Sequence, residues 1–335
     1  MGSTENAQHF SWLERALELA ERGRGTTHPN PVVGAVVVRD GQVVGEGWHE
    51  RAGGPHAEIV ALEAAGGGAR GATLYVTLEP CAHHGRTPPC ADAVVAAGIA
   101  RVVAAAGDPN PKTDGAGLAS LSAAGVEVEL PGGELERRAR RQNEAYRTWV
   151  ASGRPFVTYK AAITLDGRVA AAGGDARWVS GEESRRLAHE LRAASDAVAV
   201  GMGTVRAENP MLTARDVGAA RQPRRLAFGR GPLPAGSELE LCAGAIEEEL
   251  HRLAEEGVQS LLLEGGPTLA GAFLRAGLID KLLLFVAPKL VGGGDAPSLF
   301  AGPGTRVIAD AVPVSTLEAA KVGDDLLLTA YLHEP

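Results

Sequence analysis

Three residues of this sequence could bind one metal ion, and a fourth could carry protons beside it. His56 and Glu58 belong to a His-Ala-Glu triplet, and Cys81 and Cys90 each follow a proline. Zinc in a catalytic site takes three protein ligands of nitrogen or sulfur type and leaves a fourth position for water. A carboxylate two residues from the histidine can lie beside that water without being a ligand. The pattern therefore predicts a catalytic zinc site of His56, Cys81 and Cys90, with Glu58 as the catalytic acid/base.

The chemistry expected of such a site is hydrolysis. Zinc lowers the pKa of a bound water from about 15.7 to about 7, so hydroxide is present at neutral pH. Glu58 would accept the proton of the water and pass it to departing ammonia. We also expect Cys81 and Cys90 to lie at helix N-termini, because the positive end of the helix dipole favours the thiolate.

Two other interpretations stay open at this point. Each of these residues taken alone could be an ordinary core or salt-bridged residue. A structural zinc site usually has four protein ligands, and His83 or His84 could supply the fourth. The chain would then be a zinc-stabilised binding protein without catalytic activity.

Composition restricts the class of protein. At 335 residues the chain is long enough for two domains. Its net charge of -8 argues against a nucleic-acid binder. The N-terminus lacks the features of a signal peptide, and the uninterrupted apolar runs are too short to cross a bilayer. Three cysteines suit a metal site in a reducing cytoplasm better than a disulfide framework.

Strands and helices alternate through the first half, which predicts an α/β sheet covered by helices. We expect helices at 11–22, 56–65, 89–97, 118–124 and 134–150, and strands at 32–38, 42–48, 73–78, 101–106 and 126–130. The first two strands should form a hairpin through a turn at Gly41.

A second α/β unit is expected after the segment Ala-Ser-Gly-Arg-Pro at 151–155, whose small residues and proline predict a join between domains. The predicted domains are therefore 1–150 and 151–335. In the second we expect helices at 182–193, 246–256 and 268–276, strands at 156–163, 197–201, 225–228, 258–263 and 281–286, and a loop at 229–244.

The His-x-Glu and Pro-Cys pattern resembles the cytidine deaminase superfamily, whose signature continues as Pro-Cys-x-x-Cys. Here eight residues separate the cysteines, and the string Thr-Leu-Glu-Pro-Cys-Ala-His-His-Gly-Arg-Thr-Pro-Pro-Cys at 77–90 resembles the deaminase family of riboflavin biosynthesis. The segments 28–34, 45–49 and 107–111 resemble that family in order and spacing. The resemblance implies a three-layer, cytidine-deaminase-like fold. It also implies deamination of a diaminopyrimidinone that carries a ribosylamino 5-phosphate.

Six residues are candidates for binding that substrate: Asn30, His49, His83, Arg86, Asp108 and Asn110. Asn30 and His49 could hydrogen-bond a planar heterocycle, or could merely cap a turn and end a strand. Asp108 and Asn110 follow a strand end, where ligands bind in α/β proteins, but Asp-Pro-Asn-Pro is also a simple turn. Arg86 could bind a phosphate or belong to a solvated loop.

Three segments of the second half, 159–168, 201–210 and 263–270, resemble the reductase that is fused to this deaminase family. The resemblance implies a dihydrofolate-reductase-like fold and NADPH-dependent reduction of the ribosyl group to ribityl. Physically, Gly265 and Gly266 allow backbone amides to approach an anion, and Pro267 suits a first helical turn. Such a turn is also common for packing reasons, and no Rossmann G-x-G-x-x-G is present.

The resemblance and the residue types together nominate two sets of reductase residues. The cofactor-binding set is Ala162, Trp178, Thr204, Glu208, Gly266, Pro267 and Thr268. The substrate-binding set is Lys160, Ala176, Arg192, Leu212, Arg215 and Glu264. Lys160 could instead be a snorkelling edge residue, Trp178 could fill the core, and a lone arginine such as Arg215 could be solvated. Glu208 departs from the family, which more often has aspartate there.

The sequence thus predicts a cytoplasmic, homo-oligomeric, bifunctional enzyme that uses Zn²⁺ and NADPH. Its substrates would be small phosphorylated pyrimidines, with neither nucleic acid nor membrane as a partner. The competing hypothesis is a nucleic-acid base deaminase with an accessory domain.

Overall fold

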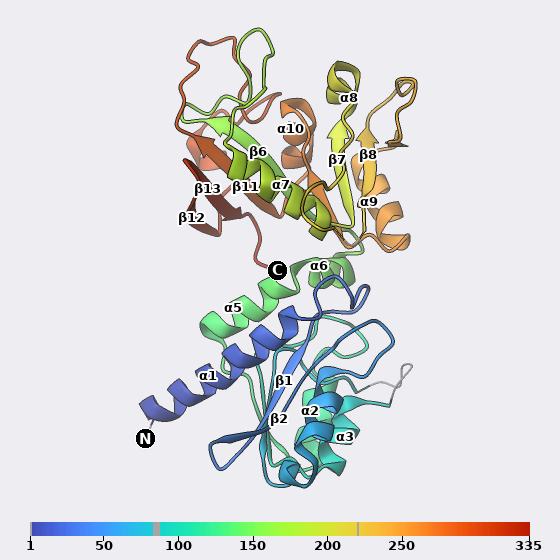
Figure 1. Cartoon of the computed structure of the whole chain (residues 1–335), viewed down its shortest axis with the longest axis vertical. Helices are drawn as coiled ribbons and strands as arrows, with labels where there is room; N and C mark the ends of the chain where they lie inside the picture. Colours follow the sequence, from blue (N-terminus) through green and yellow to red (C-terminus); the bar gives the residue numbers. More distant parts are fainter. Residues whose placement is uncertain (1, 83–87, 220) are drawn as a thin grey trace. The chain divides into compact units, whose positions relative to one another are not determined.

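The computed structural model describes residues 2–82, 88–219 and 221–335, and it describes side chains from Phe10 onward. The chain divides into two compact units, residues 1–152 and 153–334, with Pro335 grouped with the first. Each unit contains its own sheet (Figure 1). Among the described helices, none is both long enough and apolar enough to cross a bilayer.

The first unit is built on a five-stranded sheet of order β2-β1-β3-β4-β5. The strands are β1 (Gly34–Arg39), β2 (Gln42–Trp48), β3 (Thr73–Val76), β4 (Arg101–Ala104) and β5 (Glu127–Glu129). β1 runs antiparallel to both β2 and β3, so the predicted hairpin is present. β3, β4 and β5 are parallel, which brings their carboxyl ends to one edge of the sheet.

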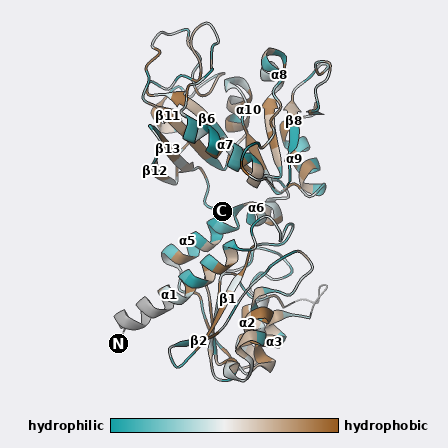
Figure 2. Ribbon diagram, viewed as in Figure 1, coloured by the Kyte–Doolittle hydropathy of each residue, from teal (hydrophilic) through white to brown (hydrophobic). Residues whose placement is uncertain are grey.

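Helices cover both faces of this sheet. They are α1 (Gly2–Glu21), α2 (Ala57–Ala65), α3 (Cys90–Ala96), α4 (Ala116–Ala123), α5 (Gly133–Gln142) and α6 (Glu144–Ser152), with a short 3₁₀ turn η1 (Gly66–Ala69). Successive strand residues point to opposite faces. Val37 therefore packs with Ala61 of α2, while Val36 packs with Leu13 of α1. The apolar character of β1 and α2 is visible in Figure 2. The result is the expected three-layer arrangement.

Two glycines allow α2 to lie directly on β2. A Cβ on Gly45 would lie 2.2 Å from the carbonyl oxygen of Ala61, and one on Gly47 would lie 2.6 Å from that of Ala57. Any larger residue would push the helix away from the sheet. The start of α2, which carries the His-Ala-Glu triplet, is therefore fixed by backbone packing.

The second unit has an eight-stranded sheet of order β12-β13-β11-β6-β10-β7-β8-β9. The strands are β6 (Phe156–Thr164), β7 (Ala197–Gly201), β8 (Arg224–Phe228), β9 (Glu240–Cys242), β10 (Ser260–Leu263), β11 (Lys281–Ala287), β12 (Thr316–Val322) and β13 (Asp325–Tyr331). The strands from β11 to β9 are parallel, and the β12–β13 hairpin is antiparallel.

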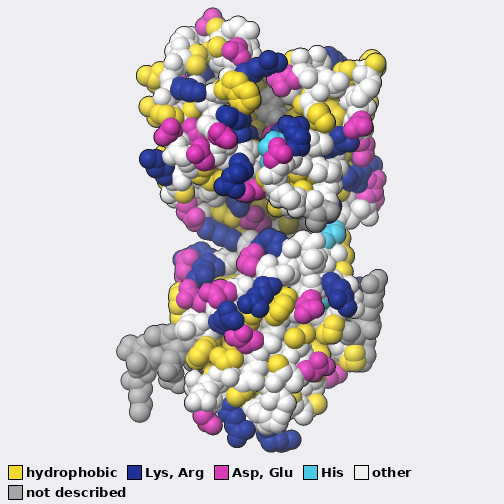
Figure 3. Space-filling view, in the orientation of Figure 1, with side chains coloured by type: hydrophobic (Ala, Val, Ile, Leu, Met, Phe, Trp, Pro, Cys, Tyr) yellow, Lys and Arg dark blue, Asp and Glu magenta, His cyan; other side chains and the backbone are white. Residues whose placement is uncertain are grey.

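Helices pack on both faces of this second sheet as well. They are α7 (Glu182–Ala194), α8 (Met202–Glu208), α9 (Ile246–Glu255) and α10 (Pro267–Arg275), with a 3₁₀ turn η2 (Ile308–Asp310). Leu261 of β10 packs with Phe273 of α10 on one face, whereas Leu262 packs with Val205 of α8 on the other. Basic and acidic side chains intermingle on the visible surface of each unit (Figure 3).

One predicted helix is in fact two helices. The segment 134–150 was expected as a single helix, but α5 ends at Gln142 and α6 begins at Glu144. Asn143 interrupts the helix with φ -114° and ψ 25°. Its buried side chain hydrogen-bonds both backbone polar groups of Val32, 111 residues earlier, and this distant contact is invisible to local periodicity.

Besides the 3₁₀ turn η2, four elements of the second unit were not predicted: α8, β9, β12 and β13. The expected loop 229–244 contains β9, which is only three residues long. The seven-residue α8 buries Met202 and Val205, too few residues for a helical period to be recognised. The β12–β13 hairpin was missed because most of β12 is exposed on both faces, so its sequence lacks the alternation of a half-buried strand.

Candidate active sites

The three predicted metal ligands come together in the first unit. The ligand atoms of His56, Cys81 and Cys90 all lie within 4.8 Å of one another. His56 Nδ1 is 3.2 Å from Cys90 Sγ and 3.7 Å from Cys81 Sγ. Tetrahedral zinc with bonds of about 2.0–2.1 Å to nitrogen and 2.3 Å to sulfur would separate N and S by about 3.5 Å. One nitrogen and two sulfurs at these distances fit a single zinc ion.

Helix starts fix the positions of two of these ligands, and a hydrogen bond from one of those helices fixes the third. His56 immediately precedes α2, and Cys90 is the first residue of α3. Cys81 lies in the segment between β3 and α3, so the expectation that both cysteines begin helices is wrong for Cys81. The backbone N–H of Cys90 nevertheless donates to Cys81 Sγ at 3.3 Å. The first backbone N–H of α3 therefore stabilises the Cys81 thiolate, although Cys81 itself lies outside that helix.

The two thiols have opposite electrostatic tendencies. Hydrogen bonds from Cys90 and His56 lower the pKa of Cys81 to about 4. The hydrogen bond to Cys81, together with burial, raises the pKa of Cys90. Two neighbouring sulfurs that resist carrying a negative charge at the same time can both ionise once a divalent cation lies between them. The cluster is therefore suited to a metal ion.

Glu58 lies on the wall of the same cavity and is only 4% exposed. Burial raises the pKa of its carboxyl group above the ordinary value. A raised pKa favours proton exchange close to neutral pH. The predicted proton carrier is thus next to the metal cluster and chemically suited to its role.

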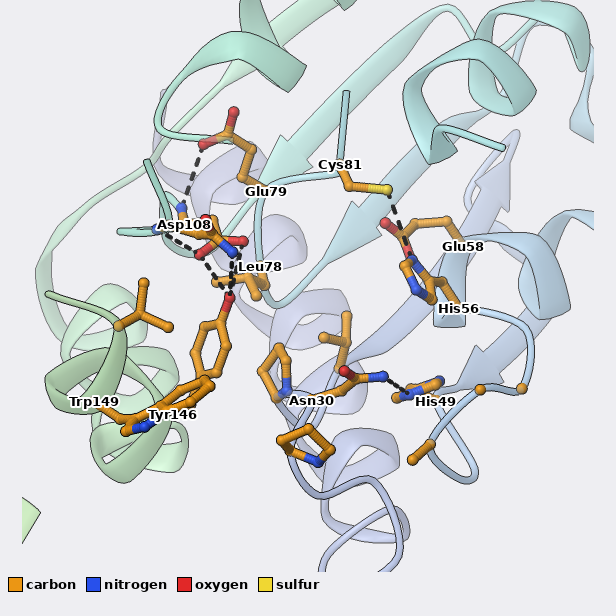
Figure 4. Close-up of a pocket in the computed structure, with 18 residues that line it drawn as sticks. Asn30, His49, His56, Glu58, Leu78, Glu79, Cys81, Asp108, Tyr146 and Trp149 are labelled. Atoms are coloured by element: carbon orange, nitrogen blue, oxygen red, sulfur yellow. Dashed lines mark hydrogen bonds between the residues drawn. The ribbon is translucent and has the colours of Figure 1, made fainter. Parts of the chain in front are cut away.

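The cavity of the first unit has a volume of about 440 Å³. His56, Glu58 and Cys81 line it together with four of the predicted substrate-binding residues: Asn30, His49, Asp108 and Asn110 (Figure 4). The other two candidates, His83 and Arg86, lie outside the described residues, as does His84, the alternative fourth ligand. The predicted deaminase residues within the described part of the chain therefore gather at one site.

Asn30 and His49 orient each other in this cavity. His49 Nδ1 lies 2.9 Å from the carbonyl oxygen of Pro55, to which it donates. His49 Nε2 then accepts from Asn30 Nδ2 at 3.1 Å, which fixes the direction of the Asn30 amide. Burial lowers the pKa of His49, in keeping with a neutral ring. The pair presents a fixed, uncharged set of hydrogen-bonding groups.

Asp108 is held by backbone and side-chain donors. Its carboxylate accepts the Asn110 backbone N–H at 3.0 Å and the Tyr146 hydroxyl at 3.2 Å. Burial raises its pKa. Asp108 and Asn110 follow β4, at the carboxyl edge of the parallel strands where ligands bind in α/β proteins.

Among the residues of the cavity wall that sequence reasoning missed are one carboxylate and two aromatic side chains: Glu79, Tyr146 and Trp149. The Glu79 carboxylate accepts four backbone N–H groups, those of Asp108, Gly115, Gly117 and Leu118, at 2.9–3.3 Å. Figure 4 shows Tyr146 and Trp149 across the cavity from His56 and Glu58. A signal was available for the aromatic pair, because positions 146, 149 and 150 share one helical face.

A second cavity, of about 980 Å³, lies in the second unit at the carboxyl ends of β6, β7 and β10. Its lining includes every predicted cofactor-binding residue: Ala162, Trp178, Thr204, Glu208, Gly266, Pro267 and Thr268. It also includes four predicted substrate-binding residues: Lys160, Ala176, Arg192 and Glu264.

The other two reductase candidates do not line this cavity. Leu212 is 4% exposed and packs in the apolar cluster around Val205. Arg215 is exposed, and its guanidinium contacts Met211 Sδ and Thr213 Oγ1.

Three charged side chains meet in the floor of the second cavity. Arg192 and Glu264 form a two-pronged ion pair. Burial alone would raise the pKa of Glu264, but hydrogen bonds from Arg192 and the charge of Lys160 outweigh it and lower that pKa. Burial lowers the pKa of Lys160. Two cations against one carboxylate leave an excess positive charge that suits an anionic ligand.

Trp178 is not a core residue, because 66% of it is exposed. Its φ of 62° is in the left-handed region that most side chains avoid. The Arg185 guanidinium lies 4.4 Å from the ring centroid, and Lys289 Nζ donates to the carbonyl oxygens of Trp178 and Val179 at 2.6 and 3.0 Å. The indole is thus held at the cavity wall from both its ring and its backbone.

Comparisons with known proteins match both halves of the chain. Residues 6–106 match the cytidine and deoxycytidylate deaminase zinc-binding region, and residues 155–328 match the RibD C-terminal domain. The riboflavin biosynthesis proteins RibD of Aquifex aeolicus and Escherichia coli are each 41% identical, covering 95% of this chain and 97% of the relative.

Solved structures agree over the whole length. RibD of Acinetobacter baumannii superposes with a TM-score of 0.86 at 37% identity, covering 97% of this chain and 99% of that one. A diaminohydroxyphosphoribosylaminopyrimidine deaminase/5-amino-6-(5-phosphoribosylamino)uracil reductase of Thermotoga maritima has a TM-score of 0.82 at 35% identity, covering 98% and 99%.

The fold and the sites define a bifunctional enzyme, a zinc-dependent deaminase joined to an NADPH-dependent reductase. The chain belongs to the RibD family and acts in riboflavin biosynthesis. The predicted α/β fold class, with a cytidine-deaminase-like first half and a reductase second half, is confirmed. The alternative of a nucleic-acid base deaminase is not favoured, because the full-length relatives are RibD proteins.

Proposed function

We propose that the first unit deaminates the diaminohydroxyphosphoribosylaminopyrimidine named for the T. maritima relative, and that the second unit reduces the resulting phosphoribosylaminouracil. One observation carries the deaminase assignment. His56, Cys81 and Glu58 share a cavity wall with the hydrogen-bonding residues Asn30 and His49. A site for water activation and a site for a polar heterocycle therefore coincide.

His56, Cys81 and Cys90 would hold the zinc ion, which when bound activates water for attack on the ring carbon. In the steps assigned to this chain, Glu58 takes a proton from the water and delivers it to the leaving amino group. The ring carbon gains a C–O bond, its C–N bond breaks, and the nitrogen leaves as ammonia.

The remaining polar residues of the first cavity would position the substrate. Asn30 and His49 hydrogen-bond the heterocycle in the fixed orientation that their mutual contact imposes. Asp108 and Asn110, which Tyr146 and Glu79 help to fix, bind the sugar hydroxyls. These contacts hold the amino-bearing carbon near Glu58 and exclude bulk water.

In the second cavity, the α10 N-terminus at Gly266, Pro267 and Thr268 would face the cofactor pyrophosphate, because free backbone amides favour an anion there. Thr204 and Glu208 of α8 and Ala162 of β6 would contact the cofactor, and Trp178 would cover the nicotinamide.

The substrate would bind in the same cavity, opposite the nicotinamide that donates the hydride. There it would contact Lys160, Arg192, Glu264 and Ala176. Leu212 and Arg215 would contribute only if the substrate extends toward residues 209–215.

The decisive experiment is to supply the diaminopyrimidine with and without NADPH and to identify the products. We expect ammonia and the ribosylaminouracil without NADPH, and the ribitylaminouracil with it. Ribityl product that still carries the original amino group would reverse the proposed order of the steps. No ammonia release would remove the deaminase assignment.

We also propose that the chain works as a homo-oligomer in a reducing compartment such as the cytoplasm. The described cysteines are all free. Exposed apolar side chains gather near the sheet-edge strand β12, a feature of self-associating surfaces; they are Val307, Ile308, Val312, Val314 and Leu317. Light scattering of the purified chain tests the oligomeric state.

A further inference from the structure

The break between α5 and α6 carries an unusual side-chain contact. Asn143 Oδ1 accepts the backbone N–H of Val32, and Asn143 Nδ2 donates to the carbonyl oxygen of the same residue, both at 2.9 Å. Asn143 is only 5% exposed. The side-chain amide of Asn143 thus hydrogen-bonds both backbone polar groups of Val32, as the backbone of a neighbouring strand would.

Val32 lies in a segment with two other backbone hydrogen bonds, from the Asn30 N–H to the carbonyl oxygen of Thr27 and from the His49 N–H to that of Val33. Pro29 and Pro31 have no backbone N–H to donate. The ladder of β1 starts only at Gly34. Asn143 therefore helps to hold the segment 29–33 in place through Val32. Four residues of this segment line the deaminase cavity: Pro29, Asn30, Pro31 and Val33.

On its other side Asn143 belongs to the start of α6. Its carbonyl oxygen accepts the N–H of Arg147 at 2.9 Å, which builds the first turn of that helix. The following residues Tyr146, Trp149 and Val150 form the facing wall of the cavity. Tyr146 in turn donates to Asp108. Asn143 is thus a direct link between the two walls, covalent on the α6 side and hydrogen-bonded on the Val32 side.

We infer that Asn143 is a positioning residue for deamination: it fixes the separation between the Asn30 wall and the Tyr146–Trp149 wall, and so sets how tightly the pyrimidine is held. This inference rests on the proposed function of the cavity. Asn143 does not line the cavity among the described residues, so it acts through Asn30 and Tyr146. Its role requires a donor and an acceptor on one short side chain.

Two variants and one matched control test this in the full-length chain. Asn143→Asp keeps the acceptor but loses the donor, and Asn143→Ala loses both. Gln142→Ala removes the neighbouring side chain, which hydrogen-bonds Leu17 and Glu21 of α1 instead of the 29–33 segment. The readouts are KM and kcat for ammonia release, bound zinc, and reduction of separately supplied ribosylaminouracil by the same protein.

We expect both Asn143 variants to lower deaminase kcat/KM by about 10–100-fold, mainly through KM. Zinc content and reductase activity should match wild type, as should the KM of Gln142→Ala. An unchanged KM in Asn143→Asp, or a loss of zinc in step with activity, would make Asn143 a folding residue and overturn the inference. Should Asn143→Ala fail to fold, Asn143→Asp decides. Absence of ammonia release from the wild type would instead overturn the proposed function.

Discussion

Arg192 and Glu264 clamp the end of β10 to α7 by two parallel hydrogen bonds, Nε to Oε1 at 2.6 Å and Nη2 to Oε2 at 2.9 Å. Their side chains are 16% and 10% exposed, so water screens the pair weakly. A planar guanidinium and a planar carboxylate hold each other in one orientation. The pair therefore gives the reductase cavity a rigid, charged floor.

Removing one charge of this pair should damage both stability and reduction. For Glu264→Gln we expect a loss of about 3 kcal/mol in the free energy of unfolding, because Arg192 is left buried without a counter-charge. Denaturant unfolding of the full-length chain, followed by circular dichroism, measures this loss. The matched control is Glu238→Gln: Glu238 pairs with Arg225 but is 73% exposed, and its loss should cost at most about 1 kcal/mol. Equal losses in the two variants would contradict the prediction.

The same carboxylate predicts a pH dependence. The pKa of Glu264 is lower in the folded state than its ordinary value of about 4.3. Its contribution to stability is therefore fully present above that value and is lost as pH falls toward the folded pKa. Denaturation of wild type at pH 6 and at pH 3.5 should show a larger drop than in Glu264→Gln. Parallel curves for the two proteins would rule out this source of acid sensitivity.

Glu58→Gln should abolish ammonia release while leaving the rest of the enzyme intact. The amide keeps the shape of the side chain but cannot accept and return a proton, so we expect kcat to fall by about 10²–10⁴-fold. Metal analysis should find zinc bound as in wild type, since Glu58 is not among the clustered ligands. Reduction of supplied ribosylaminouracil should be unchanged. Near-normal ammonia release would show that another group carries the proton.

Removal of zinc should separate the two activities. A chelator should reduce deamination to background, whereas NADPH oxidation with supplied ribosylaminouracil should continue, because the second unit has its own cavity. Readdition of zinc should restore ammonia release. Deamination by protein from which all zinc has been removed would be inconsistent with a role for His56, Cys81 and Cys90 as ligands.

Lys289→Met should weaken cofactor binding by loosening Trp178. The variant keeps the length of the side chain but loses the ammonium that holds two successive carbonyl oxygens. The left-handed backbone at Trp178 costs about 1–3 kcal/mol and needs such support. We expect KM for NADPH to rise several-fold and the quenching of Trp178 by NADPH to decrease. Lys321→Met, on the exposed strand β12, is the control and should leave both unchanged.

The sequence was most informative where function depends on short local motifs. His56 and Glu58 begin one helix, and Cys90 begins another, so strand and helix boundaries placed them at one sheet edge. The same logic put Gly266, Pro267 and Thr268 at the start of α10. Local chemistry and local structure coincide at these positions, and little tertiary information is needed.

Residues that depend on distant contacts escaped prediction. Tyr146 and Trp149 line the deaminase cavity from α6, which begins after the break at Asn143, and the Asn143 side chain there hydrogen-bonds the distant Val32. Leu212 shows how packing bears on such a prediction. The resemblance suggested a substrate contact, but the side chain is buried in an apolar cluster. A motif specifies which residues occur together, whereas packing decides which of them face the cavity.

The Glu79 carboxylate has a wider consequence for how such enzymes can diverge. Four main-chain amides, two from the loop beyond β4 and two from the start of α4, bind it, and the first sulfur ligand comes only two residues later. The second sulfur ligand begins α3, and its backbone N–H also donates to the first sulfur. We therefore expect changes in the length of the segment between the two cysteines to leave both metal ligands in place, which metal analysis of such variants can check.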